Sequence, residues 1–103
     1  EMHAEVCKSM ANPTRLKIMN LLRDGEKSVE ELKKQLGLPK ANLSQHLGIL
    51  RQRGIVSSRR AGLNIYYRVT NTKMIRACDI LREVLFELMR ENEKLARGMT
   101  RKR

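Results

Sequence analysis

The stretch PKANLSQHLGILRQRGIV, residues 39–56, decides the fold. Leu43, Leu47 and Leu50 recur at spacings of four and three residues, which predicts a helix with one buried apolar face. The opposite face carries polar or small side chains, namely Lys40, Ala41, Ser44 and Gln45. A face of this kind is either ordinary solvent exposure or a surface built to contact something polar.

Start and stop signals divide the rest of the chain into helices. Asn12 can cap a helix that has Pro13 at its first position, and Ser28 with Glu31 forms the pattern of a capping box. Gly37 ends the helix that Ser28 begins. We expect helices over residues 2–11, 13–23, 29–36 and 40–53, and a long last helix that Thr72 caps and that runs to about residue 95.

Two β-rich runs lie between the fourth and the last helix. IVSSRR (55–60) and IYYRV (65–69) flank AGLN (61–64), whose Gly and Asn suit a hairpin turn. Two short helices joined by a Gly-containing turn and followed by a two-stranded ribbon make a helix-turn-helix with a wing. We therefore expect one mainly α, winged helix-turn-helix domain over residues 1–95, and a basic tail over residues 96–103.

The charge of the chain indicates its kind of partner. The 103 residues include 22 Lys and Arg against 11 Asp and Glu, so the net charge is +11. This excess favours a polyanion, with double-stranded DNA first and an anionic membrane surface second. Aromatic residues make up only 3 %, which argues against a module that grips single strands by stacking.

Other features exclude several classes of protein. No apolar run is long enough to span a membrane, and the first residues lack the apolar core of a secretory signal. Two cysteines fit a reducing cytosol, so we expect a cytoplasmic protein without a membrane partner. His3 and His46 lie far apart with no nucleophile or phosphate loop arranged around them, so we expect neither an enzyme nor a required cofactor.

Two segments, ANPTRLKIMNLL (11–22) and SVEELKKQLGLPKANLSQHLGILRQRGIVSSRRAGLNIYYRV (28–69), resemble the ArsR/SmtB family of bacterial and archaeal winged-helix repressors. The resemblance covers roughly residues 4–90, and its most specific part is LSQHLGILRQRGIV followed by YYRV. It implies a homodimer, formed by the first and last helices, that binds a palindromic operator and releases it when an effector binds. It also implies that Lys40, Ala41, Ser44 and Gln45 face bases and that Asn42 lies near a phosphate.

The side chains of this face suit duplex DNA. Gln45 can pair bidentately with adenine, Lys40 can bind guanine and Ala41 can touch a thymine methyl group, each good pairing discriminating by ~1–3 kcal/mol. Ser44 is expected at a phosphate. His46 borders the buried face, and we expect it to be a structural, hydrogen-bonded histidine rather than a base contact.

Three polar residues flank the turn of the expected wing, where they would reach the DNA backbone or the minor groove: Arg59, Arg60 and Asn64. Because neighbouring residues of a strand point to opposite faces, the two arginines cannot make the same contact, and we favour Arg60. The same alternation predicts that one of Tyr66 and Tyr67 is buried.

The last helix carries an apolar seam at alternating spacings of four and three residues, interrupted only by Asn92: Met74, Cys78, Leu81, Leu85, Leu88 and Leu95. Such a seam packs along another helix, and a chain this short has little domain left to cover it. We therefore expect a homodimer interface here, to which Val6 and Met10 of the first helix contribute. The dimer would place two reading helices one duplex turn apart, ~34–36 Å.

The effector sites of the better-known relatives are absent from this sequence. The segment SVEEL (28–32) has no cysteine, and the positions that bind zinc in relatives hold Asn71, Lys73, Val84 and Glu87, of which only Glu87 could ligate. What remains is the trio His3, Cys7 and Cys78. Three interpretations stay open: inert buried cysteines, reversible thiol oxidation, and binding of a thiophilic metal or metalloid.

The function that these patterns favour is a sequence-specific transcriptional regulator, a homodimeric repressor relieved by an effector or by thiol oxidation. The alternative is an architectural protein that coats DNA with little sequence preference. The polar reading face counts against it, because a coating protein needs no such face. A winged-helix module for protein contacts is a third possibility.

Overall fold

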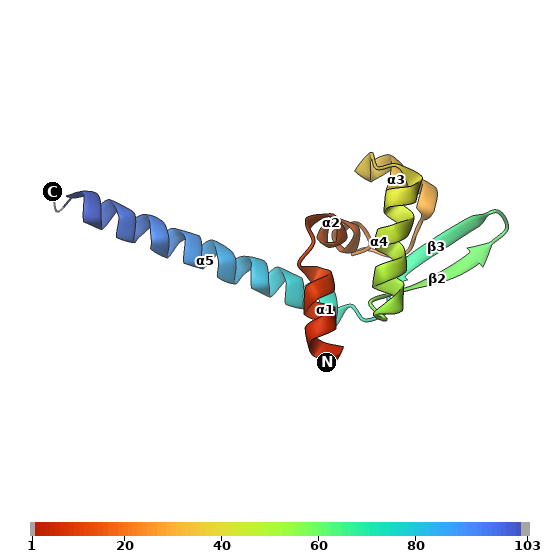
Figure 1. The fold of residues 1–103 in the computed structure, drawn as a ribbon, viewed down its shortest axis with the longest axis horizontal. Helices are drawn as coiled ribbons and strands as arrows, with labels where there is room; N and C mark the ends of the chain where they lie inside the picture. The colour runs from red at the N-terminus through yellow and green to blue at the C-terminus, as the bar shows by residue number, and fades with distance from the viewer. Residues whose placement is uncertain (1, 102–103) are drawn as a thin grey trace.

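The computed structural model describes residues 2–101, and side chains over residues 3–97. Its elements are α1 (Met2–Met10), α2 (Pro13–Leu21), β1 (Lys27–Ser28), α3 (Val29–Leu36), α4 (Lys40–Gln52), β2 (Val56–Ala61), β3 (Asn64–Val69) and α5 (Lys73–Arg101). Helices α1–α4 and the sheet gather into one body, here called the head (Figure 1). Helix α5 leaves the head on one side and the β2–β3 hairpin projects on the other, which confirms the mainly α fold with a wing.

The helix ends follow the local signals of the sequence. The Asn12 side-chain oxygen accepts hydrogen bonds from the backbone N–H groups of Thr14 and Arg15, at 2.9 and 3.2 Å. Ser28 and Glu31 form the expected capping box at the start of α3. Gly37 ends α3 with φ of 65°, a left-handed conformation that suits glycine.

The sheet has three strands in the order β1-β3-β2, all antiparallel. The sequence predicted only the hairpin and missed β1, in which Lys27 pairs with Tyr67 and Ser28 with Tyr66. A two-residue strand shows no alternation of its own and exists only because β3 lies beside it. The hairpin turn is also tighter than expected, because Ala61 pairs with Asn64 and only two residues remain between the strands.

The core lies where the helices of the head meet the sheet. Its buried apolar side chains are Ile18, Met19, Leu22, Leu32, Leu43, Leu47, Leu50, Ile55, Val56, Tyr67, Val69 and Ile75. Tyr67 is buried and Tyr66 only half-buried, which confirms the alternation expected of the two tyrosines. The sequence of the second helix predicts that its apolar residues Leu16, Ile18, Met19 and Leu22 all point inward, and for Leu16 this prediction is wrong, because Leu16 is 36 % exposed. Leu16 and Ile18 lie about 200° apart around the helix, and Ile18 occupies the core side.

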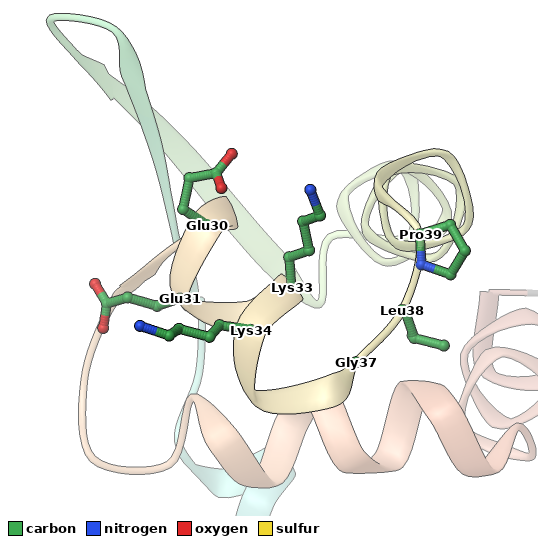
Figure 2. A pocket seen from close by; sticks show the side chains of 7 residues that line it. All are labelled: Glu30, Glu31, Lys33, Lys34, Gly37, Leu38 and Pro39. Atoms are coloured by element: carbon green, nitrogen blue, oxygen red, sulfur yellow. The ribbon is translucent and has the colours of Figure 1, made fainter.

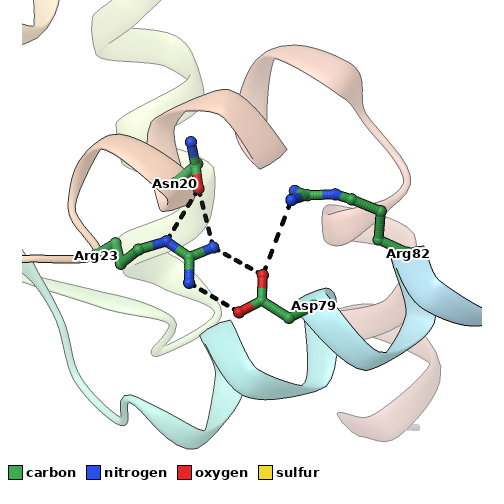
Figure 3. A network of polar contacts seen from close by, with 4 residues as sticks. All are labelled: Asn20, Arg23, Asp79 and Arg82. Carbon is green, nitrogen blue, oxygen red and sulfur yellow. Dashed lines mark hydrogen bonds and ion pairs between the residues drawn. The ribbon is translucent and has the colours of Figure 1, made fainter.

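A polar network joins the base of α5 to the end of α2 (Figure 3). The Arg23 guanidinium donates to both carboxylate oxygens of Asp79, at 2.7 Å each, and also to the side-chain oxygen of Asn20. Arg82, one turn further along α5, lies 3.9 Å from Asp79. The Arg23 hydrogen bonds lower the pKa of Asp79 below its ordinary value.

Helix α5 differs from the expected last helix at both ends. The side-chain bond at its start is made by Asn71, whose oxygen accepts from the Lys73 N–H at 3.0 Å, in place of the cap expected from Thr72. At the other end the helix continues to Arg101, whereas the sequence predicted that it ends at about residue 95. With 29 residues it is about 43 Å long.

Candidate nucleic-acid interface

Helix α4 separates an apolar from a polar face as its sequence predicts. Leu43, Leu47 and Leu50 are at most 1 % exposed. The residues predicted to contact DNA are all exposed: Lys40, Ala41, Asn42, Ser44 and Gln45. Gly48 is exposed as well and extends this face by one turn without a side chain. We call these exposed residues of α4 the reading face.

The first turn of α4 has an electrostatic conflict. Pro39 precedes the helix, and among the described side chains none caps its first N–H groups by a hydrogen bond. Lys40 occupies the first helical position, where the positive end of the helix dipole disfavours a cation. The helix therefore begins with free backbone donors and a positive side chain together, an arrangement that an anion would stabilise.

His46 is held by the rest of the head. Its Nδ1 atom accepts a hydrogen bond from Arg15 Nε at 3.3 Å, and Arg15 Nη1 donates to the Ser9 carbonyl oxygen at 3.3 Å. The imidazole is half-buried. The expected structural role of His46 is thereby confirmed, since this contact fixes α4 against α2 and α1.

The two adjacent arginines of the wing lie in different surroundings. Arg59 Nε donates to Glu26 Oε2 at 2.9 Å, a second guanidinium contact reaches the other Glu26 oxygen, and the guanidinium lies 4.7 Å from the centre of the Tyr66 ring. The hydrogen bonds from Arg59 lower the pKa of the Glu26 carboxyl. Arg60 is exposed and shares the opposite strand face with Tyr67. DNA contact by Arg59 would therefore compete with its ion pair to Glu26, whereas Arg60 lies on the opposite face of the strand, away from Glu26.

A hollow of about 130 Å³ separates the reading face from the tip of the wing. Its lining residues are Val29, Glu30, Lys40, Ser44, Leu47, Leu63, Asn64, Ile65 and Tyr67. Reading face and wing tip thus border one concave surface. Among the lining residues, Leu63 was not singled out by the sequence, although a leucine in a turn otherwise made of small and polar residues was a usable signal.

A second hollow lies beside the α3–α4 turn (Figure 2). It is lined by Glu30, Glu31, Lys33, Lys34, Gly37, Leu38 and Pro39. The two glutamates offset the two lysines, so this surface has no net charge with which to attract phosphate. It does not resemble the reading face, where Lys40 stands among neutral side chains.

The surface predicted for dimerisation divides between the two ends of α5. Near the head, Val6, Met10, Met74 and Cys78 are half-buried. Further along, Leu81, Leu85 and Leu88 are 58, 51 and 54 % exposed. Leu95, Val84 and Met89 are exposed on the same helix. An apolar surface of this length is typical of a helix that packs against a partner.

The three residues of the possible effector site line one apolar hollow between α1 and α5. Its lining residues are His3, Val6, Cys7, Met10, Ala11, Met74, Ala77, Cys78 and Leu81. Burial raises the pKa of the Cys78 thiol and makes it a weaker nucleophile, while Cys7 is exposed. Within the described part of one chain, no three His, Cys, Asp or Glu side chains converge into a metal site. A thiol or metal effector shared between two protomers stays a prediction.

None of the described helices is long and apolar enough to cross a membrane.

Comparison with known proteins identifies the family. Residues 12–58 match the model described as "Bacterial regulatory protein, arsR family". A biofilm growth-associated repressor of Xylella fastidiosa is 44 % identical over 70 residues, which are 68 % of this chain and 61 % of the repressor. A protein of Mycobacterium tuberculosis described as an uncharacterized HTH-type transcriptional regulator is 36 % identical over 90 residues, covering 86 % of this chain and 79 % of that protein.

A solved structure agrees with these relatives. The homodimeric winged helix-turn-helix DNA-binding domain from Mycobacterium bovis, a possible ArsR-family transcriptional regulator, superposes with a TM-score of 0.76 at 33 % identity and covers 85 % of this chain and 82 % of that domain. The present chain spans only 61 % of the length of the Xylella fastidiosa repressor. The matched proteins are regulators of transcription rather than enzymes. Fold, reading face and relatives agree, and the chain belongs to the ArsR family of bacterial regulatory proteins.

Proposed function

We propose that this chain is a homodimeric, sequence-specific DNA-binding regulator that acts as a repressor on a palindromic operator in the cytoplasm. The observation that carries the proposal is the division of α4. The leucines of α4 are buried, and five residues in its first two turns are exposed: Lys40, Ala41, Asn42, Ser44 and Gln45. A helix of this design can enter a major groove without disturbing the core that holds it.

The reading face supplies the chemistry for base recognition. Gln45 offers the donor and acceptor that adenine pairs with, Lys40 offers donors to guanine, and Ala41 offers a methyl contact to thymine. Ser44 and Asn42 donate hydrogen bonds to phosphate oxygens. The uncapped first turn of α4 adds backbone N–H donors near Lys40, which favours a phosphate at that point.

The apolar surface of α5 supplies the second half of the proposal. Pairing two chains through α1 and α5 covers Leu81, Leu85 and Leu88 and presents two reading faces from one particle. Half-sites one helical turn apart, ~34–36 Å, would then be contacted together. A palindromic operator follows from the two-fold symmetry.

Binding is tested on a duplex recovered by selecting a random 30-base-pair pool with the protein. Fluorescence anisotropy should show tight binding to this duplex that weakens by ~10³–10⁵ between 50 and 200 mM salt if six to ten phosphates are contacted. Gln45→Ala should reduce the preference for the selected duplex over a scrambled one. Arg60→Ala should weaken binding to both duplexes alike.

The same measurement separates the repressor from a coating protein. Equal affinity of the wild-type protein for selected and scrambled duplexes would contradict sequence-specific recognition and leave architectural binding. If Gln45→Ala kept the full preference for the selected duplex over the scrambled one, base recognition by the reading face would be contradicted. Both variants change exposed side chains, so their melting temperatures should match that of the wild type.

A further inference from the structure

Leu63 is an apolar side chain with no role in the fold. Its exposed fraction is 100 %, while the next most exposed large apolar residue described, Leu95, is 64 % exposed. The exposed apolar residues of α5 repeat along one helix and are explained by a partner helix. Leu63 lies in the turn between β2 and β3. The β2–β3 hairpin projects from the head on the side away from α5 (Figure 1).

The turn that holds Leu63 is short and well defined. Ala61 pairs with Asn64, so Gly62 and Leu63 alone connect the strands. Gly62 has φ of 63°, and Leu63 is not among the residues with positive φ. A two-residue turn with positive φ only at its first central residue fits type II′, which has glycine at that position and leaves the second position open to polar residues. Folding therefore gives no reason for a leucine here.

The position of Leu63 relates it to the proposed DNA surface. Leu63 and Asn64 line the same hollow as Lys40 and Ser44 of the reading face. Arg60 lies one residue before the end of β2, close to the turn. When a reading helix occupies a major groove, a wing that borders the same concave surface reaches across the phosphate backbone to the adjacent minor groove.

The minor groove suits this side chain physically. It is ~6 Å wide, wide enough for one side chain, and proteins place leucine among other apolar residues there. A·T pairs present only acceptors on its floor, whereas guanine adds a protruding amino donor. A leucine above that amino group would be obstructed and would leave the donor unpaired, which is costly. Arg60 and Asn64 beside it would provide charge and hydrogen bonds to the groove edges.

We propose that Leu63 is a specificity residue that enters the operator minor groove and selects A·T pairs beneath the wing. The inference rests on the proposed function, because it needs α4 in the neighbouring major groove. It adds a second, apolar element of recognition to the polar reading face. The two elements read different grooves and can be altered independently.

The test uses a base analogue that changes one groove. Replacing adenine by 2,6-diaminopurine in the A·T segments of the selected duplex that flank the α4 contacts adds an amino group to the minor groove and leaves the major-groove edge unchanged. Wild-type affinity should fall about tenfold on this duplex, within the usual cost of a mismatched pair. Leu63→Ser should bind the unmodified duplex about tenfold more weakly and should not respond to the analogue. Leu63→Met should retain the wild-type response.

Arg60→Ala is the control that separates leucine from charge. This variant should weaken binding to both duplexes and still respond to the analogue. The inference is overturned if Leu63→Ser binds both duplexes as the wild type does, which would leave Leu63 for another partner, or if it still responds to the analogue. Failure of the proposed function looks different, because the wild-type protein would then not distinguish selected from scrambled DNA at all.

Discussion

The head and helix α5 distribute their apolar side chains in opposite ways. In the head, leucines such as Leu32, Leu43 and Leu50 are completely buried and the exposed face of α4 is polar. On α5, leucines such as Leu85 and Leu88 are more than half exposed. The head thus buries its core together with Ile75 from the first turn of α5, whereas the rest of α5 has an apolar surface that this chain leaves open to water.

This difference indicates two kinds of stability in one chain. The stability of the head depends on contacts within the chain, and in the proposed homodimer that of the distal part of α5 would depend on contacts with a second chain. Apolar burial contributes ~25 cal/mol per Å² in both cases. Mutations in the two regions should therefore be distinguished by how their effects depend on protein concentration.

The largest expected effect comes from the core of the head. Leu32→Ala removes a side chain that is 0 % exposed and should lower the free energy of unfolding by about 2–5 kcal/mol, because a cavity remains. Urea denaturation measures it. Leu63→Ala deletes the same atoms from a fully exposed leucine and should leave the free energy of unfolding within ~0.5 kcal/mol of the wild type. Equal losses in both variants would contradict the core described here.

The next effect concerns the apolar surface of α5. Leu85→Glu places a charge on the proposed interface in both protomers and should raise the dimer dissociation constant at least 100-fold, since two apolar contacts of ~1.5–3 kcal/mol are lost. Sedimentation at several concentrations measures it. Arg90→Glu introduces the same residue about half a turn away from Leu88 and should leave the dimer intact. A monomeric wild-type protein would refute the assignment.

Two glycines of the head should respond to substitution in opposite ways: Gly37 has a positive φ that favours glycine, and Gly48 lies on the exposed face of α4. Gly37→Ala should destabilise the protein by about 1 kcal/mol, because alanine must adopt φ of 65° at the end of α3. Gly48→Ala should stabilise it by up to about 1 kcal/mol, because α4 gains helix propensity and nothing lies within 4 Å of the added methyl group. Thermal unfolding of both variants measures the opposite signs. A loss of stability in Gly48→Ala would show that the position is more crowded than the structure describes.

The smallest effect concerns the ion pair between Arg23 and Asp79, which joins the head to α5. Because Arg23 lowers the pKa of Asp79, their pair stabilises the fold above the ordinary carboxyl range, and this contribution is lost as the pH falls through the lowered pKa. Asp79→Asn should therefore be less stable than the wild type at pH 7, with a gap that closes on acidification. Denaturation from pH 7 to pH 3 measures the gap. Glu26→Gln is the matched comparison. The pKa of Glu26 is also lowered, so its pair with Arg59 should show a pH dependence of the same sign, but this pair lies within the head and does not involve α5.

Local features of the sequence predicted much of the head. The capping box of Ser28 and Glu31, the left-handed Gly37 and the leucine spacing of α4 each depend on residues within a few positions of one another. The reading face was predictable for the same reason, because fixing the buried side of a helix also fixes its exposed side. These features would be present in any fold that contains these helices.

The remaining features join residues that are distant in sequence. Strand β1 forms only against β3, Arg59 meets Glu26 across 33 positions, and Arg23 meets Asp79 across 56. The inward prediction for Leu16 failed because the apolar character of a residue does not specify which side of its helix meets the core.

The sequence by itself determined the helices, the caps of α2 and α3, the polar side of α4 and the basic charge that draws the protein to DNA, since all of these follow from residue type and local spacing. Only the tertiary structure decided which arginine of the wing is already bound to a carboxylate, and that Leu63 stands fully exposed beside the reading face. Both depend on elements that meet through packing, and packing is determined by the whole chain at once.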